Sequence, residues 1–124
     1  MPKHIKVLLD RQVLIAYDAD KEVFCFDCAS GDRSHPTPPG QYQILRKHPI
    51  YRSKKYDVQM DYAMFFSRDG KAIHKSHAVG PISYLKYFNF HWFGSHGCVR
   101  LAEGDAKTLF EWTPVGTRVE IAPA

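Results

Sequence analysis

Apolar and polar residues alternate along the first thirty positions in a way that predicts β-strands. The segments HIKVLLD (4–10) and QVLIAYD (12–18) are separated by Arg11 alone, a spacing typical of a hairpin. The segment EVFCFDCA (22–29) follows the polar turn DADK and is rich in residues that favour strands. The chain is therefore predicted to begin with three strands.

The middle of the chain predicts a loop followed by further strands. SGDRSHPTPPG (30–40) contains three prolines and two glycines, so regular structure is excluded there. This loop leads into QYQILR (41–46), which we predict to be one strand. YAMFF (62–66) and KAIH (71–74) flank the turn signal RDG and predict a second hairpin.

The pattern changes after His74. KSHAVGPISYLKYFNFHWFG (75–94) has six aromatic residues without a strict period, and we expect a loop around a short helical turn near 82–88. AEGDAKTLFEWT (102–113) has apolar residues at helical spacing and acidic residues in its first turn, which predicts a helix. GTRVEIAP (116–123) predicts a closing strand.

These elements predict a single domain over residues 1–124 that is mainly β, with one main α-helix near the C-terminus. The composition agrees, because 44% hydrophobic residues in 124 positions suffice for one packed core. No apolar run approaches the roughly 20 residues that span a bilayer, so we expect no stable membrane insertion. Asp10 and Arg11 also interrupt the first apolar stretch, which argues against a signal peptide. We expect a cytoplasmic protein if the chain is complete, and a periplasmic or cell-envelope protein if it is a trimmed domain.

The net charge of +4 permits an acidic partner. RKHPIYRSKK (46–55) is the densest basic run, and Tyr51 within it gives the basic and aromatic mixture that binds nucleic acid. No helix-turn-helix, zinc-finger or RNP pattern accompanies the run. We therefore predict a solvated loop and no nucleic-acid partner.

Three cysteines, an odd number, argue against a disulfide framework. Cys25 and Cys28 form a C-x-x-C pair, but residues three apart on a strand point to opposite faces. No second C-x-x-C is present to complete a zinc site. We predict two unlinked thiols, which fit a reducing compartment better than an oxidising one.

The third cysteine lies in FGSHGCVRLA (93–102), and its neighbours favour catalysis. A cysteine nucleophile needs a base, donors for an oxyanion, and small neighbours that let a carbonyl approach. Ser95 and Gly97 leave such room, and the backbone N–H groups of Gly97 and Cys98 can point at an oxyanion. The base must come from elsewhere in the sequence, and His74 at the end of KAIH is the natural candidate.

SHGCVRL (95–101) resembles the signature of the L,D-transpeptidase catalytic domain, the YkuD family. TPPG (37–40) matches the turn before a central strand of that family, and AIH (72–74) matches its upstream histidine segment. GDAKTLFEWTPVGTRVEI (104–121) matches its closing helix and strand, so the resemblance covers most of the chain. It implies a β-sandwich-like fold and an enzyme that acts on peptidoglycan stem peptides without a cofactor.

The resemblance also implies a reaction. The thiolate attacks the carbonyl of diaminopimelate in a tetrapeptide donor and expels the terminal D-alanine. The acyl-enzyme then passes to an amine acceptor, giving 3–3 or 1–3 cross-links. The alternative is transfer to water, which would make the protein an L,D-carboxypeptidase of peptidoglycan recycling.

Carried over position by position, the resemblance makes Cys98 the nucleophile and His74 the base. It makes His96 a supporting residue and Gly97 an oxyanion donor together with Cys98. Many members have glycine after the histidine, where this chain has lysine. His74 also precedes Cys98 by 24 positions, against 21 for His77, so His77 stays a rival for the base.

The aromatic segment suggests a cap over the substrate, although the same aromatics would also suit packing on the core. The predicted substrate-binding residues are Arg100, Ser95, Trp92, Tyr84 and His77.

Two remoter alternatives stay open. His74 and His77, or His91 and His96, are able to join Cys98 as zinc ligands, but no H-E-x-x-H motif frames them. The other alternative is an inactive module that binds peptidoglycan.

Overall fold

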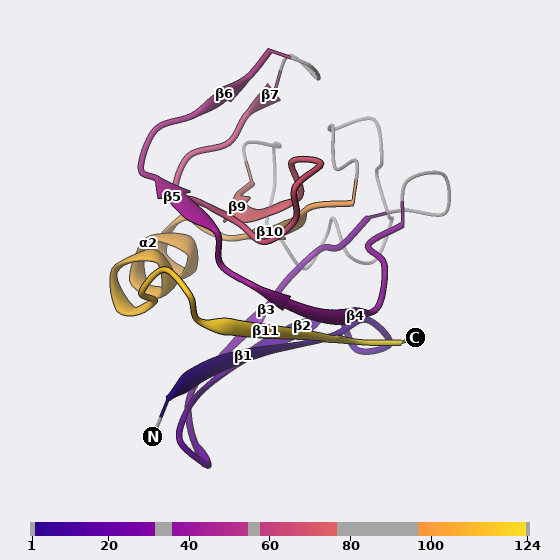
Figure 1. Ribbon diagram of the computed structural model, residues 1–124, viewed down its shortest axis with the longest axis vertical. Helices are drawn as coiled ribbons and strands as arrows, with labels where there is room; N and C mark the ends of the chain where they lie inside the picture. The colour runs from indigo at the N-terminus through magenta and orange to yellow at the C-terminus, as the bar shows by residue number, and fades with distance from the viewer. Residues whose placement is uncertain (1, 32–35, 55–57, 77–96, 124) are drawn as a thin grey trace.

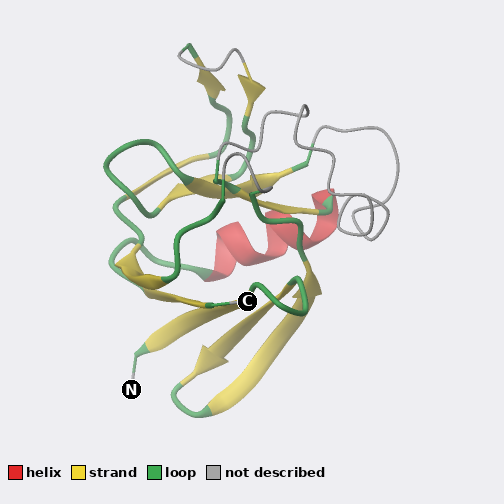
Figure 2. Ribbon diagram, turned by 90° about the vertical axis from the view of Figure 1, so that its right-hand side faces the viewer, coloured by secondary structure: helices red, strands yellow, loops and turns green. Residues whose placement is uncertain are grey.

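The computed structural model of the protein describes residues 2–31, 36–54, 58–76 and 97–123. Two β-sheets form separate layers, and the helix α2 (Glu103–Trp112) lies between them (Figure 1, Figure 2). This is the mainly β, sandwich-like architecture with one helix near the C-terminus that the sequence predicts. Within the described ranges, no helix has the length and apolar character needed to cross a membrane.

The larger sheet has five strands in the order β3-β2-β1-β11-β4. Its members are β1 (Lys3–Leu8), β2 (Val13–Asp18), β3 (Lys21–Asp27), β4 (Gly40–Gln43) and β11 (Arg118–Ala122). The predicted strands at the beginning and end of the chain are confirmed. β1 and β11 pair in parallel, so the closing strand lies in the centre of the sheet beside the first one.

The smaller sheet has four strands in the order β10-β9-β8-β5. Its members are β5 (Arg46–His48), β8 (Ala63–Phe65), β9 (Ala72–Lys75) and β10 (Val99–Leu101). β8 and β9 form the predicted antiparallel hairpin, whereas β9 and β10 are parallel. A two-stranded hairpin, β6 (Arg52–Ser53) and β7 (Val58–Gln59), extends away from both sheets (Figure 1).

The main core fills the space between the two sheets. Ile5 and Val7 of β1 face Ile73 of β9 and Val99 of β10 across it, and Leu109 of α2 is buried among them. A second cluster lies on the other face of the smaller sheet and contains Met60, Ala63, Phe65, Ala72 and Cys98. The predicted nucleophile therefore belongs to the face of this sheet that points away from the main core.

The prediction of one strand over QYQILR (41–46) is wrong. β4 ends at Gln43 and β5 begins at Arg46, and the two strands belong to different sheets. The Ile44 N–H donates to the Thr117 carbonyl at 2.9 Å, and the Leu45 N–H donates to the Phe65 carbonyl at 2.7 Å. The chain thus crosses from one layer to the other at this point, which local strand propensity does not reveal.

The prediction of a solvated loop over 46–55 is wrong in part, because β5 and β6 lie within it. The Arg46 guanidinium carbon lies 3.9 Å from the centroid of the Phe65 ring, so the basic run begins as an ordered edge strand. The two other thiols agree with the prediction of unlinked cysteines. Cys25 is exposed on β3, Cys28 is buried just beyond it, and neither forms a disulfide.

Candidate active site

The parallel pairing of β9 and β10 brings the two predicted catalytic residues together. Ile73 lies opposite Val99, and His74 lies opposite Arg100. Ile73 and Val99 point into the main core. Because side chains alternate along a strand, His74 and Arg100 point to the opposite face.

Cys98 stands just before β10 on this same face. The Ala72 N–H of β9 donates to the Cys98 sulfur at 3.4 Å, and both residues belong to the second cluster. Ala72 and His74 are two positions apart on β9, so the Cys98 sulfur and the His74 ring lie on one side of the sheet, along neighbouring strands.

Gly97 occupies the turn before Cys98 and has to be glycine for two reasons. Its φ is +92°, a backbone conformation that costs little only for a residue without a Cβ. A Cβ built there would lie 2.6 Å from Cε of Lys71 and 3.2 Å from the Pro36 carbonyl oxygen. The positive φ and the nearby backbone oxygen of Pro36 therefore explain the glycine that the sequence places before the cysteine, whereas the end of the Lys71 side chain is flexible and could move.

The surroundings of Cys98 oppose its ionisation. The residue is 4% exposed, and burial raises the pKa of its thiol from 9.0 to about 11. The Ala72 N–H and the positive charges of Arg100 and Lys71 act against this rise, but they do not cancel it. In this state the sulfur holds its proton at neutral pH, so a nucleophilic role requires a base.

His74 has the tautomer that a base needs. Its Nδ1 lies 2.7 Å from the Lys75 carbonyl oxygen. A carbonyl oxygen only accepts, so Nδ1 carries the hydrogen in this contact, and in the neutral ring Nε2 carries the lone pair. The ring is 3% exposed, so its orientation is fixed by packing as well as by this bond.

Arg100 is a buried cation beside this pair. It is 2% exposed, and its backbone is held by hydrogen bonds in both directions with Ala29, each 2.9 Å long. Within the part of the chain that the structure describes, its Nε and Nη1 have no hydrogen-bond partner. Burial lowers the pKa of Arg100, yet a guanidinium stays charged in proteins. The site therefore holds a positive charge suited to an anionic group.

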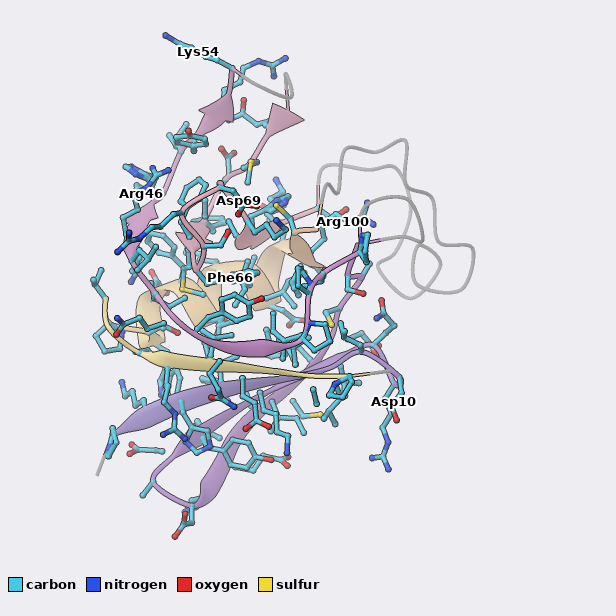
Figure 3. The ribbon with its side chains drawn as sticks, turned by 45° about the vertical axis from the view of Figure 1, so that its right-hand side comes forward. Asp10, Arg46, Lys54, Phe66, Asp69 and Arg100 are labelled. Carbon is cyan, nitrogen blue, oxygen red and sulfur yellow. The ribbon has the colours of Figure 1, made fainter. Side chains whose placement is uncertain are left out.

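Lys71 and Asp69 form an ion pair next to the site, and the sequence did not predict this ion pair. The Lys71 ammonium binds the Asp69 carboxylate, and this hydrogen bond is the main cause of the lowered pKa of Asp69. The two residues come from the turn between β8 and β9. Figure 3 shows Asp69 between Arg46 and Arg100, which lie at opposite edges of the smaller sheet. The sequence RDGK before AIH marks the turn, but it does not reveal that Lys71 packs against Gly97.

Several predicted residues lie outside the described residues. They are His77, Tyr84, His91, Trp92, Ser95 and His96, so the aromatic cap and the rival base stay predictions. Among the described residues, no group of three or more His, Cys, Asp or Glu side chains is placed to hold a metal ion. The zinc alternative needs His77, or His91 and His96, in addition to Cys98, and these three histidines lie outside the described residues, so it also stays untested.

Comparison with known proteins identifies the family and supports the fold. The family model described as the L,D-transpeptidase catalytic domain, YkuD, matches residues 2–121. A search of curated proteins finds no match. Solved structures do match. An L,D-transpeptidase from Stackebrandtia nassauensis is 30% identical with a TM-score of 0.84, and the match covers 99% of this chain and 56% of that one.

Two further solved structures are 25% identical with TM-scores of 0.82. One is an L,D-transpeptidase of Enterococcus faecium with a cysteine-to-serine substitution, matched over 98% of this chain and 50% of that one. The other is the Ldtfm–avibactam carbamoyl enzyme, matched over 100% of this chain and 50% of that one. The chain thus spans between 50% and 56% of the length of these three solved chains.

Proposed function

The chain belongs to the L,D-transpeptidase catalytic domain family, YkuD, and on that premise we propose that it is a cysteine L,D-transpeptidase acting on peptidoglycan stem peptides. Cys98 forms an acyl-enzyme with the diaminopimelate residue of a tetrapeptide donor. The acyl group then passes to an amine acceptor on a second stem. As part of the same proposal, the domain works at the cell envelope, where cross-linking takes place.

The observation that carries this proposal is the placement of Cys98 and His74 on one face of two neighbouring parallel strands. The Gly97 turn, with its φ of +92°, leads the chain into Cys98 just before β10, and the His74 tautomer leaves Nε2 able to take a proton. A cysteine with a histidine on the adjacent strand fits nucleophilic catalysis, because the histidine can take the proton that the raised pKa of the buried thiol retains. The pairing of a cysteine with a general base is the pattern that acyl transfer requires.

In the proposed reaction, His74 transfers one proton during acylation and one during the transfer to the acceptor. His74 Nε2 takes the proton of the Cys98 thiol, and the sulfur forms a bond to the diaminopimelate carbonyl carbon, which gives an oxyanion. The C–N bond to D-alanine then breaks, and its nitrogen takes the proton from His74. An acceptor amine attacks the thioester and gives a proton to His74. The C–S bond breaks and the sulfur recovers that proton, so the product is a new amide and free enzyme.

Arg100 is the proposed contact for a stem-peptide carboxylate. Its guanidinium is buried on the site face, and two of its nitrogens have no partner within the described part of the chain. A buried cation is costly unless it is paired, and a substrate carboxylate would supply the partner. Its charge also favours the Cys98 thiolate, because the positive charge of Arg100 lowers the pKa of that thiol.

The test is to incubate the purified protein with a disaccharide tetrapeptide and to identify the products by mass spectrometry. Dimers joined through diaminopimelate, with release of D-alanine, support the proposed transfer. Tripeptide without dimer would show that water accepts the acyl group, which makes the protein an L,D-carboxypeptidase instead.

Two substitutions serve as controls. Cys98→Ala should abolish turnover, because it removes the sulfur that forms the thioester. Cys25→Ala removes an exposed thiol on β3 and should leave turnover unchanged. Turnover that survives in Cys98→Ala, or loss of turnover on addition of a metal chelator, would contradict the proposal.

A further inference from the structure

Thr37, the first residue of the TPPG motif, reaches the peptide bond that precedes the cysteine. Its Oγ1 lies 2.8 Å from the Gly97 carbonyl oxygen, and this bond joins residues 60 positions apart. Thr37 is a buried polar residue, so the contact is shielded from water. The roles proposed above for Cys98, His74 and Arg100 do not involve this hydrogen bond.

The direction of the Thr37 hydroxyl hydrogen follows from its two partners. The Gly31 N–H donates to Oγ1 at 2.8 Å, and an N–H group only donates. The Gly97 carbonyl oxygen only accepts. The hydroxyl therefore accepts from Gly31 and donates to Gly97, and the loop before β4 holds the Gly97 carbonyl in one orientation.

This bond also orients the Cys98 N–H. No described peptide bond is cis, and in a planar trans peptide the C=O and the following N–H point in opposite directions. When Thr37 holds the Gly97 oxygen, the Cys98 N–H is directed away from Thr37. A rotation of this peptide would displace the carbonyl from its buried donor, and a buried carbonyl without a donor is unfavourable.

Lys71 and Pro36 also lie close to Gly97. Lys71 Cε and Cδ lie 2.6 and 3.0 Å from the position of a Cβ on Gly97, and the Pro36 carbonyl oxygen lies 3.2 Å from it. Lys71 and Pro36 thus fill the space that a side chain on Gly97 would need, whereas the Thr37 hydroxyl adds a directional bond to the peptide itself.

We propose that Thr37 is a positioning residue, whose hydroxyl orients the Gly97–Cys98 peptide so that the Cys98 N–H donates to the oxyanion formed during acylation. The inference rests on the proposed function, because it assigns a donor for the oxyanion of that reaction. It also gives the TPPG motif a part in the site, because Thr37 of that motif holds the Gly97 carbonyl next to Cys98.

Two substitutions separate the hydroxyl from the volume of the side chain. Thr37→Val keeps the shape and removes the hydroxyl, whereas Thr37→Ser keeps the hydroxyl. Thr113→Val is the matched control, because Thr113 is equally buried and its Oγ1 donates to the Leu109 carbonyl at 2.7 Å at the end of α2. Thr113→Val thus removes a buried hydrogen bond from a threonine hydroxyl to a backbone carbonyl that involves neither Gly97 nor Cys98.

Three rates are measured: turnover of the tetrapeptide, carbamoylation by avibactam, and alkylation of Cys98 by iodoacetamide. In carbamoylation the sulfur bonds to the urea carbonyl carbon, the ring C–N bond breaks and the nitrogen takes the proton, so an oxyanion forms on the way. In alkylation the sulfur displaces iodide from a CH₂ group, and no oxyanion forms. Alkylation therefore reports on access to the thiol and on its ionisation alone.

We expect Thr37→Val to lower the rates of tetrapeptide turnover and of carbamoylation by about 10- to 100-fold. This loss is smaller than the loss of about 10²–10³ seen when an oxyanion donor is removed outright. The KM for the tetrapeptide and the rate of alkylation should stay within about twofold. Thr37→Ser should recover most of the lost rate, and Thr113→Val should acylate as fast as the unsubstituted protein.

Other outcomes overturn the inference. Equal losses in acylation and alkylation would show that Thr37 only supports the local structure, and unchanged acylation in Thr37→Val would show that its hydroxyl is dispensable. Failure of the inference about Thr37 can be distinguished from failure of the proposed function. If the unsubstituted protein is carbamoylated but does not turn over the tetrapeptide, the proposed substrate is wrong, and the carbamoylation rates still decide the role of Thr37.

Discussion

At the scale of single residues, the site is built around a cysteine whose surroundings keep it protonated. Burial of Cys98 raises its pKa to about 11, and the nearby Arg100 and Lys71 offset this only partly. A thiol in this state is protected from side reactions until a base acts on it. In the proposed reaction, His74 supplies that base when a substrate occupies the site.

The raised pKa predicts how stability depends on pH. The thiol ionises near 9.0 in the unfolded chain and near 11 in the folded protein, so the folded state retains the proton where the unfolded state loses it. The contribution of Cys98 to stability is therefore fully present below about pH 9 and is lost as the pH rises through about 11. A shift of this size corresponds to about 2 to 3 kcal/mol.

Urea unfolding of the unsubstituted protein and of Cys98→Ala between these two pH values measures this contribution. The free energy of unfolding of the unsubstituted protein should fall by about 2 to 3 kcal/mol more than that of the variant. If the two proteins lose stability in parallel, Cys98 ionises equally easily in the folded and unfolded states, and the raised pKa is wrong.

At the scale of elements, the helix α2 is joined to both sheets at its C-terminal end. The helix has no basic residue in its own last turn. Instead, Lys47 of β5 donates to the carbonyl oxygen of Thr113 at 2.7 Å and also to that of Phe110. Lys3 of β1 donates to the carbonyl oxygen of Trp112 at 2.8 Å. These ammonium groups satisfy terminal carbonyls and complement the negative end of the helix dipole.

We therefore expect Lys47→Met to destabilise the protein by about 1 to 3 kcal/mol, because it leaves two partly buried carbonyls without their charged donor. The matched control is Lys107→Met, which removes the same charge from an exposed position of α2 and should cost less than about 0.5 kcal/mol. Thermal or urea unfolding of both variants measures the difference. Equal effects would show that the two hydrogen bonds of Lys47 do not contribute.

The elements that depend on local pattern could be predicted from the sequence. The strands at both ends, the hairpin around RDG and the helix all follow from periodicity and turn residues. QYQILR could not be predicted correctly, because its division between two sheets depends on bonds to Thr117 and Phe65, which are distant in sequence. Tertiary contacts override local propensity in such segments.

In the site too, residues marked by a local motif could be predicted, whereas contacts between distant segments could not. Cys98, Gly97 and Arg100 stand together in one motif, and the strand KAIH indicates His74, so these candidates follow from the sequence. The contacts of Thr37 and Lys71 with Gly97 join segments far apart in the chain, and no spacing rule predicts them. The motif TPPG carried the only signal for Thr37, and that signal indicated a turn rather than a hydrogen bond to the active-site backbone.

At the scale of the whole molecule, the main core and the candidate site lie on opposite faces of the smaller sheet. The main core lies between the sheets and around α2, whereas Cys98, His74 and Arg100 lie on the outer face of the smaller sheet. The parallel pairing of β9 and β10 brings residues 24 positions apart into one site. The same core fold occurs within solved L,D-transpeptidases of roughly twice this length, which supports its use as a catalytic unit.

The central claim is that Cys98 carries the acyl group of a stem peptide. The most direct measurement is to mix the protein with a disaccharide tetrapeptide, quench the reaction with acid, and locate any added mass by proteolysis and mass spectrometry. We expect an acyl group equal to the tetrapeptide donor without D-alanine, on the fragment that contains Cys98, and no such group in Cys98→Ala. Consumption of the donor with the acyl group on Cys25 or Cys28, or with an acyl group still present in Cys98→Ala, would contradict it.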